Sequence, residues 1–440
     1  MPSQESSTEE TTEPTRGGLS RRGLFGALGA GAALVGAGAV AGRVTAPEHE
    51  STLDDVVGFY GEHQSGIVTP AQDRMHFVAF DVTTDSRDDL VRLLQTWTDV
   101  AARMTAGAET FPDGAFGGAQ YAPPSDTGEA LDLTPSQLTL TIGFGPSLFG
   151  TAENDRFGIY SKKPVALANL QHFPGDNLDP ARSGGDIAIQ ACSNDPQVAV
   201  HAVRNLARLG VGTVAVKWSQ LGFGRTSSTS QAQVTPRNLM GFKDGTNNIK
   251  AEDDVAVDQF VWVDPADDQE WLAGGTYMVT RRIRMLIESW DRTTLNEQER
   301  VIGRFKGNGA PFGGADEFDV VDLRSQGPGG PIVAKDAHIR LASHESLNGI
   351  KLLRRGYNFT DGSDGFGHLD AGLFFIAFCR NPLEQFVPMQ LQLARSDSLN
   401  EYIQHVASAV FVVPPGLHDG AYWGSTLFGA APPPVSPTDR

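Results

Sequence analysis

The order of strand-like and helix-like segments in the first half constrains the fold of this chain more than any other feature. Runs rich in β-branched and aromatic residues alternate with two segments whose apolar residues recur at helical spacing. In chain order they are strand 75–82, helix 88–104, strand 138–144, strand 186–192, helix 198–209 and strand 211–218. This is the order of the ferredoxin-like split unit. The pattern therefore predicts an α+β fold in which helices cover one face of an antiparallel sheet.

The second half repeats the order more loosely. Strands are expected at 277–287, 373–379 and 410–414, and helical segments at 296–303, 383–393 and 399–406. A Gly-, Pro- and Asp-rich insertion at 304–372 interrupts the pattern, and long insertions of this kind are often functional. We expect two ferredoxin-like halves with antiparallel sheets, of the dimeric α+β barrel type. Their predicted bounds are 47–240 and 241–428, followed by a flexible Pro-rich tail at 429–440.

The first 46 residues have the pattern of an export signal. Arg21 and Arg22 precede an uncharged run, residues 23–42, that consists mostly of Gly, Ala, Val and Leu. Paired arginines before a weakly apolar run are typical of a twin-arginine signal. A membrane anchor is the alternative, since the run is long enough to span a bilayer, but Gly and Ala contribute little to insertion. We therefore expect residues 1–46 to engage the twin-arginine translocase, and the protein to act in the periplasm, the cell envelope or outside the cell.

Charge and cysteine content exclude several classes of function. The formal net charge is -18, and the first 46 residues do not change it because they hold four acidic residues and four arginines. An acidic protein repels phosphate backbones, so nucleic acid is not an expected partner. The two cysteines, Cys192 and Cys379, lie in apolar strand-like runs. This excludes a disulfide scaffold and a CxxC metal site, and two buried free thiols are expected, with a single bridge as the alternative.

The segment 238–248 is the first of three clusters that can carry chemistry. Gly241 and Gly245 bracket Asp244, so the backbone can turn tightly there or approach a flat ligand closely. An ordinary Asp-Gly turn has the same pattern. The segment therefore predicts either a plain turn or a ligand contact that uses Asp244.

A histidine and an arginine pair form the other two clusters. His338 lies in the insertion, with Asp336 two residues before it. A neutral imidazole can bind a metal centre when a partner orients its other nitrogen. Arg354 and Arg355 are adjacent on a strand-like segment, so their side chains point to opposite faces. One could enter a pocket while the other reaches solvent, although a surface basic pair has the same pattern.

Taken together, these motifs resemble the dye-decolourising peroxidase family, and in particular its twin-arginine-exported branch, over residues 70–425. The most specific element is Gly-Phe-Lys-Asp-Gly-Thr at 241–246, which matches the GxxDG motif of that family. The other matching stretches are 173–176, 185–192, 195–197, 338–342 and 353–357.

The resemblance implies that the C-terminal half binds haem b. By position, His338 resembles the axial ligand of the haem iron, Asp244 the distal acid–base group and Arg354 the distal cation. The residues implied as haem contacts are Gly245, Thr246, Asn247, Ser343, His344 and Arg354. Asp397 is the expected partner for the other nitrogen of His338, with Asp336 as the alternative.

The resemblance also implies a peroxidase that reduces hydrogen peroxide and oxidises dyes, phenols or other one-electron donors. Asp244 would move the proton and Arg354 would stabilise the peroxide anion. The alternative is a deferrochelatase that releases iron from haem for an envelope iron-uptake system, because both functions need the same pocket. A haem-free binding protein of related fold is a third possibility, disfavoured by the presence of all three site residues. A homo-oligomer is compatible with these expectations.

Overall fold

The computed structural model of the chain describes residues 55–430. The predicted signal at 1–46 and the tail residues 431–440 lie outside the described residues. No helix between residues 55 and 430 combines the length and the apolar character needed to cross a bilayer.

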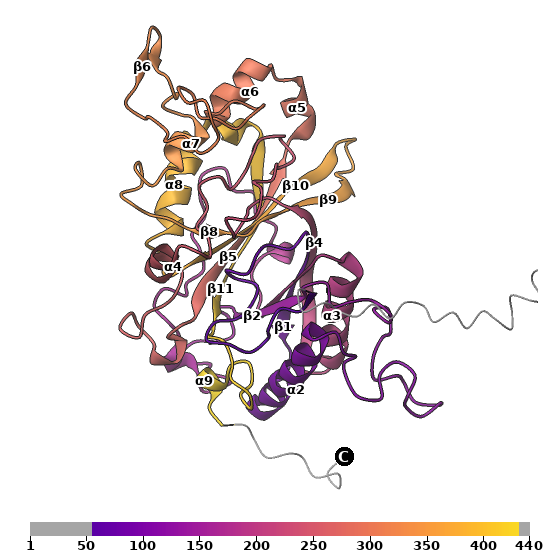
Figure 1. Cartoon of the computed structure of the whole chain (residues 1–440). Helices are drawn as coiled ribbons and strands as arrows, with labels where there is room; N and C mark the ends of the chain where they lie inside the picture. The colour runs from indigo at the N-terminus through magenta and orange to yellow at the C-terminus, as the bar shows by residue number, and fades with distance from the viewer. Residues whose placement is uncertain (1–54, 431–440) are drawn as a thin grey trace, which may run out of the picture. The chain divides into compact units, whose positions relative to one another are not determined.

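Strands form the centre of this part of the chain and helices lie around them (Figure 1). The first half contains β1 (Arg74–Val82), α2 (Arg87–Thr105), β2 (Thr139–Phe144), β3 (Ile187–Ser193), α3 (Pro196–Leu209) and β4 (Val214–Arg225). After α4 (Asp254–Phe260) follow β5 (Thr276–Met285), α5 (Ile287–Arg292), α6 (Leu295–Ile302), β6 (Gln326–Gly327), β7 (Gly330–Pro331) and α7 (His338–Leu341). The last elements are β8 (Leu353–Arg354), β9 (Tyr357–Ser363), β10 (Leu369–Cys379), α8 (Phe386–Ser396), β11 (Ile403–Val413) and α9 (Ser425–Phe428).

The strands of the two halves have the same spatial order and join into one barrel. In the first half the order is β2-β3-β1-β4, and in the second it is β11-β5-β10-β9. Both are the order of a ferredoxin-like unit, as the sequence predicts. Antiparallel pairing of β4 with β9 and of β11 with β2 connects the halves, so that eight strands of the described chain close into a ring. The α+β fold is confirmed, while the boundary at residue 240 stays a prediction.

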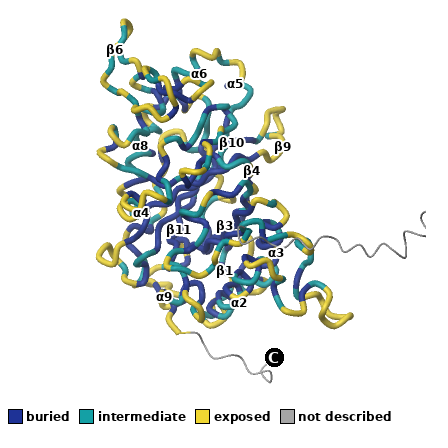
Figure 2. Tube along the Cα trace, in the orientation of Figure 1, coloured by how far each residue is buried: buried dark blue, intermediate teal, exposed yellow. Residues whose placement is uncertain are grey.

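Alternation along β1 separates the barrel interior from the layer beneath the helices. Met75 and Phe77 belong to the hydrophobic cluster that fills the barrel. Val78 and Phe80 belong to the cluster that packs against α2 and α3. Successive side chains of a strand point to opposite faces, so one apolar strand serves both cores. Buried residues consequently follow the sheet through the middle of the molecule (Figure 2).

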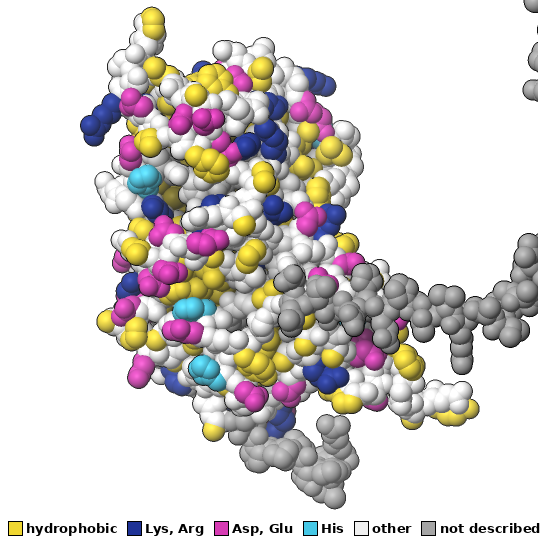
Figure 3. All heavy atoms as spheres, in the orientation of Figure 1, with side chains coloured by type: hydrophobic (Ala, Val, Ile, Leu, Met, Phe, Trp, Pro, Cys, Tyr) yellow, Lys and Arg dark blue, Asp and Glu magenta, His cyan; other side chains and the backbone are white. Residues whose placement is uncertain are grey.

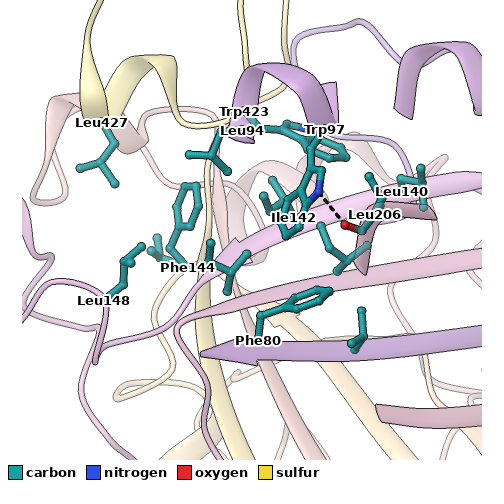
Figure 4. Packing of buried hydrophobic residues seen from close by; sticks show 14 of the residues in the cluster. Phe80, Leu94, Trp97, Leu140, Ile142, Phe144, Leu148, Leu206, Trp423 and Leu427 are labelled. Carbon is teal, nitrogen blue, oxygen red and sulfur yellow. Dashed lines mark hydrogen bonds between the residues drawn. The ribbon is translucent and has the colours of Figure 1, made fainter. Parts of the chain in front are cut away.

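Helix α2 is held on the sheet by its N-terminal cap and by one tryptophan. The Ser86 hydroxyl accepts a hydrogen bond from the Asp89 backbone N–H at 3.2 Å, which satisfies a free donor of the first turn. On the buried face, the Trp97 indole donates to the Leu206 carbonyl at 2.8 Å and lies above Phe80 (Figure 4). The apolar spacing in this segment therefore forms the helix that it predicts.

One predicted helix in the second half is wrong. Instead of a helix at 399–406, the chain forms a 3-10 turn over Ser398–Glu401 and then begins strand β11. The Asp397 carboxylate caps this turn by accepting from the Leu399 N–H at 2.8 Å. Pairing with β5 then holds the following residues extended, so a partner distant in sequence overrides the local pattern.

The insertion is also smaller than predicted. The range 304–372 contains α7, β8 and β9, and β9 is the second strand of the C-terminal ferredoxin-like unit. Strand β4 starts three residues later than predicted and continues to Arg225, beyond the predicted end at residue 218. Both cysteines are free and buried, as expected.

A buried histidine makes this fold sensitive to acid. His405 on β11 is 8% exposed, and its two ring nitrogens lie 3.3 Å from the side chains of Arg281 and Gln390. Burial, and then the positive charge of Arg281, lower the pKa of His405 to about 3 from 6.5. Between these values the unfolded chain binds a proton that the folded chain does not. Stability is therefore lost as the pH falls through 6.5 towards 3.

We expect His405→Gln to reduce this acid sensitivity. Through His405 the wild type should lose about 2 kcal/mol of unfolding free energy between about pH 7 and pH 5, and the variant should not. Urea unfolding at both pH values measures the loss. The control is the His418→Gln variant, because His418 is exposed. This variant should lose as much unfolding free energy as the wild type. An equal loss in all three proteins would exclude His405 as the cause.

Candidate functional site

A tight loop presents Asp244. Arg237 and Lys243 form an antiparallel bridge at its base, and the Asp244 N–H donates to the Pro236 carbonyl at 2.9 Å. Gly241 has a φ of 83°, a left-handed conformation that glycine adopts without strain. The loop rests on a hydrophobic cluster that includes Met285 at the end of β5 and residues of α5 and α6, two helices that lie together at the top of Figure 1.

Arg354 lies on the two-residue strand β8, which pairs with β10 at Ala377. Its neighbours Leu353 and Tyr357 belong to the barrel interior, so the Arg354 side chain points to the outer face of the sheet. On the free edge of β8, Asn248 takes the place of a neighbouring strand. Its Oδ1 accepts from the Arg354 N–H at 2.7 Å and its Nδ2 donates to the Arg354 carbonyl at 2.8 Å.

Arg355 does not reach solvent, so that prediction is wrong. Its side chain is 0% exposed and points into the barrel. The guanidinium donates to the carbonyls of Ile67 and Thr69 and to the side chain of Gln72. The two arginines do point to opposite faces of the sheet, as predicted. Arg354 points to the outer face, whereas Arg355 points into the protein interior and not into solvent.

The structure brings Asp244 and Arg354 together. Nη1 of Arg354 donates to Oδ1 of Asp244 at 2.9 Å, and the two side chains are 28% and 15% exposed. The other carboxylate oxygen, Oδ2, accepts from Nδ2 of Asn238 at 3.2 Å. A carboxylate and a guanidinium are thus paired but still accessible.

Asp397, and not Asp336, is the partner of His338. Nδ1 of His338, at the start of α7, lies 2.6 Å from Oδ2 of Asp397, which is 6% exposed. Asp336 instead binds Arg300 at 3.2 Å and the Ser398 hydroxyl at 2.5 Å. The buried carboxylate orients the imidazole and leaves Nε2 as the nitrogen that a metal centre could use.

The imidazole also interacts electrostatically with the Asp244–Arg354 pair. Burial lowers the pKa of His338, but the Asp397 carboxylate outweighs this effect and the pKa is raised overall. Asp244 adds to the increase and Arg354 opposes it. His338 lies deep in the protein yet keeps 32% of its side-chain surface accessible, so a ligand can reach it. The three predicted groups therefore lie near enough for their charges to act on one another.

Cations outnumber carboxylates on the Asp244 side of this site. The cations are Lys243, Lys250, Arg304 and Arg354, and the carboxylates are Asp244, Glu252 and Glu317. Burial, and then Arg354, lower the pKa of Lys250, which indicates that positive charges crowd one another there. Over the described residues, the molecular face shown in Figure 3 has no such excess of cations. Acidic side chains are spread over that face, with Lys and Arg side chains between them. An anionic ligand would relieve this local excess.

The three residues after Asp244, which are predicted haem contacts, have different surroundings. Gly245 has a φ of 86°, and a Cβ there would lie 2.8 Å from the Cα atom of Ser227, so a side chain would be both strained and crowded. The Thr246 hydroxyl donates to Glu317 at 2.9 Å, and Asn247 is exposed. Glycine thus allows the close packing of this loop, while haem contacts at these positions stay predictions.

Ser343 and His344 follow α7. The Ser343 hydroxyl donates to the Arg340 carbonyl at 2.9 Å, and His344 is exposed. Neither side chain bonds to the three central groups, so their predicted haem contacts are not tested by this geometry.

The sequence predicted no role for several residues that shape the site. Asn238 and Asn248 end the segment that it singled out, but an asparagine gives no sign of which distant group it will bind. Arg304 and Glu317, which are 7% and 8% exposed, lie within the Gly- and Pro-rich insertion. Two nearly buried charged residues in a loop indicate a structured site, because a buried charge needs a partner. Both their burial and their partners are known only from the folded structure.

Known proteins match the chain over nearly all of its described length. The family model "Dyp-type peroxidase, N-terminal" matches residues 64–224, and "Dyp-type peroxidase, C-terminal" matches residues 235–418. The deferrochelatase of Escherichia coli (strain K12) is 37% identical over 422 residues, which cover 93% of this chain and 96% of the relative. The deferrochelatase of Yersinia pseudotuberculosis is 35% identical over 419 residues, with 92% and 93% covered.

Solved structures agree with this match. DtpA from Streptomyces lividans, in an oxyferrous/water mixed complex, is 39% identical with a TM-score of 0.77, and the match covers 85% of this chain and 97% of that one. A DyP-type peroxidase from Cellulomonas bogoriensis is 37% identical with a TM-score of 0.75, with 85% and 98% covered. Because both halves match the family models and full-length relatives exceed a third in identity, the chain belongs to the Dyp-type peroxidase family.

Proposed function

We propose that this chain is a haem b peroxidase that reduces hydrogen peroxide with electrons from dyes, phenols or similar one-electron donors. One observation carries the proposal: the Asp244–Arg354 pair, joined at 2.9 Å, shares a site with an imidazole that Asp397 orients at 2.6 Å. Peroxide reduction needs an acid–base group, a fixed cation and an open metal centre in one place. Family membership supports the same reaction class.

The residues present fit a haem group. His338 offers a single imidazole whose other nitrogen is already held by a carboxylate, the usual arrangement for a haem-iron ligand. The excess of cations near Arg354 suits the two propionate carboxylates of haem b. Bound haem would supply an iron centre that accepts peroxide and passes its oxidising equivalents to electron donors.

Asp244 and Arg354 have complementary tasks in this proposal. The O–O bond of peroxide breaks readily only when the leaving oxygen departs as water, so a proton must move from one peroxide oxygen to the other. The Asp244 carboxylate can accept that proton and return it. The Arg354 guanidinium, already beside the carboxylate, can stabilise the negative charge that develops on oxygen.

Release of iron from haem is the second candidate function. The observation in its favour is the name of the curated relatives, which are deferrochelatases at 35% and 37% identity. Iron release needs the same haem pocket as peroxidase chemistry, so the geometry described above serves both functions.

We further propose that residues 1–46 direct export through the twin-arginine pathway, which would place the enzyme in the periplasm, the envelope or outside the cell. The paired arginines Arg21 and Arg22 before the uncharged run 23–42 support this proposal. We also propose that the exported protein can interact with an envelope iron-uptake system and can form a homo-oligomer.

Replacing the proposed iron ligand should remove haem. We expect His338→Ala, supplied with haem and then freed of excess by gel filtration, to retain roughly a tenth or less of the wild-type Soret absorbance per protein. His418→Ala, an exposed position, is the control and should retain all of it. Full haem retention in His338→Ala would contradict the assignment.

Replacing either distal group should slow the reaction with peroxide while haem stays bound. We expect Asp244→Asn and Arg354→Leu to lower the second-order rate constant roughly 10²- to 10⁴-fold, because each removes proton transfer or charge stabilisation. Stopped-flow absorbance of the Soret band measures the rate. Wild-type rates in both variants would show that these groups do not act on peroxide.

The two candidate functions predict different products. With peroxide and a phenolic dye, the peroxidase proposal expects dye oxidation with haem intact. Incubation with a reductant and no peroxide should then yield no metal-free porphyrin, which porphyrin fluorescence detects. Porphyrin formed in amounts that match the haem lost, without dye turnover, would favour iron release.

A further inference from the structure

Asn238 makes a contact that neither the motif nor the proposed mechanism uses. Its Nδ2 atom donates to Oδ2 of Asp244 at 3.2 Å, while Oδ1 of Asp244 accepts from Arg354 at 2.9 Å. Each oxygen of the carboxylate therefore has a different donor, one neutral and one charged. Together the two hydrogen bonds restrain rotation of the carboxylate.

The surrounding loop determines which end of the Asn238 amide faces Asp244. The Met240 N–H donates to Oδ1 of Asn238 at 3.0 Å, which commits that oxygen to the turn and leaves Nδ2 for the carboxylate. The Asn238 backbone is fixed as well, because its N–H donates to the Phe242 carbonyl at 3.1 Å and its carbonyl accepts from Gly241 at 2.9 Å. The amide is thus held as a donor towards Asp244.

We propose that Asn238 is a positioning residue that holds the Asp244 carboxylate in the orientation needed for proton transfer. An N–H that donates to a carboxylate favours its ionised form over its protonated form. The proposal rests on the proposed function, in which Asp244 accepts a proton from the incoming ligand.

Other charged groups also act on Asp244 but do not replace this donor. Arg354 on β8 contacts the carboxylate directly, and His338 on α7 interacts with it electrostatically. Lys243, next in sequence, is bound to Glu317 instead. Among the described residues, none of these groups forms a hydrogen bond with Asn238, so a substitution at Asn238 removes one donor to the carboxylate and leaves the other charged groups in place.

Two substitutions separate a tuning role from a structural one. Asn238→Ala removes both the donor and the acceptor for Met240. Asn238→Asp keeps an oxygen for the Met240 N–H but turns an oxygen, instead of an N–H, towards Asp244. Asn308 offers a matched control, since its Oδ1 accepts from the Ala310 N–H at 3.0 Å in the same kind of turn while its Nδ2 donates to the Ala315 carbonyl at 2.9 Å.

The test follows the haem-loaded protein by stopped-flow Soret absorbance from about pH 3 to pH 8. One series measures the rate with hydrogen peroxide. The other measures association of cyanide, which binds iron as an anion after hydrogen cyanide loses its proton, and which therefore reports the distal base without requiring turnover. Wild type, both Asn238 variants, Asn308→Ala, Asn308→Asp and Asp244→Asn are compared.

In both series we expect the acid limb of the rate profile to move up by about one pH unit in Asn238→Ala and further in Asn238→Asp. At pH values below the limb the rate constant should fall about tenfold for each pH unit of this shift. At pH values above the limb it should equal that of the wild type. The Asn308 variants should match the wild type.

A uniform fall at every pH in Asn238→Ala, with a wild-type profile in Asn238→Asp, would overturn the proposal and leave Asn238 a structural residue of the turn. Persistence of the acid limb in Asp244→Asn would instead overturn the role of Asp244 itself, and this inference with it.

Discussion

Closure of the sheet is the constraint on which the rest of the structure depends. A ferredoxin-like half alone has two free edge strands, whose unpaired N–H and C=O groups are costly to bury and prone to aggregation. Here each half supplies the missing partners of the other, through β4–β9 and β11–β2. The barrel that results buries a second apolar cluster that neither half could enclose alone.

The site lies where this closure is incomplete. Strand β4 pairs with β9 near Arg225 and then departs, so the edge of β8 beyond it has no strand partner. The side-chain amide of Asn248 fills that edge with two hydrogen bonds to Arg354. Because Asn248 also ends the loop that carries Asp244, one amide links the Arg354 backbone to the Asp244 loop. A gap in the sheet is thus closed by the residues that build the site.

Charge within the site contrasts with charge on the molecule as a whole. The chain has a net charge of -18, yet Arg354 and three further cations gather near three carboxylates. Glu317 holds part of this group together by binding Lys243 and Thr246. Placing like charges together is unfavourable unless a ligand of opposite charge offsets it, so this cluster is better explained by an anionic cofactor than by stability.

By itself the sequence determined the α+β class and most of the helices and strands, and it predicted Asp244, His338 and Arg354 as the central site residues. It could do so because periodic apolar runs specify strands and helices locally, and because short motifs carried the family resemblance. Only the tertiary structure decided that Asp397 orients His338, that Arg355 is buried and that residues 403–413 form a strand. Each of these depends on a partner far away in the chain, and local sequence holds no information about which distant group will complete a hydrogen bond or a sheet edge.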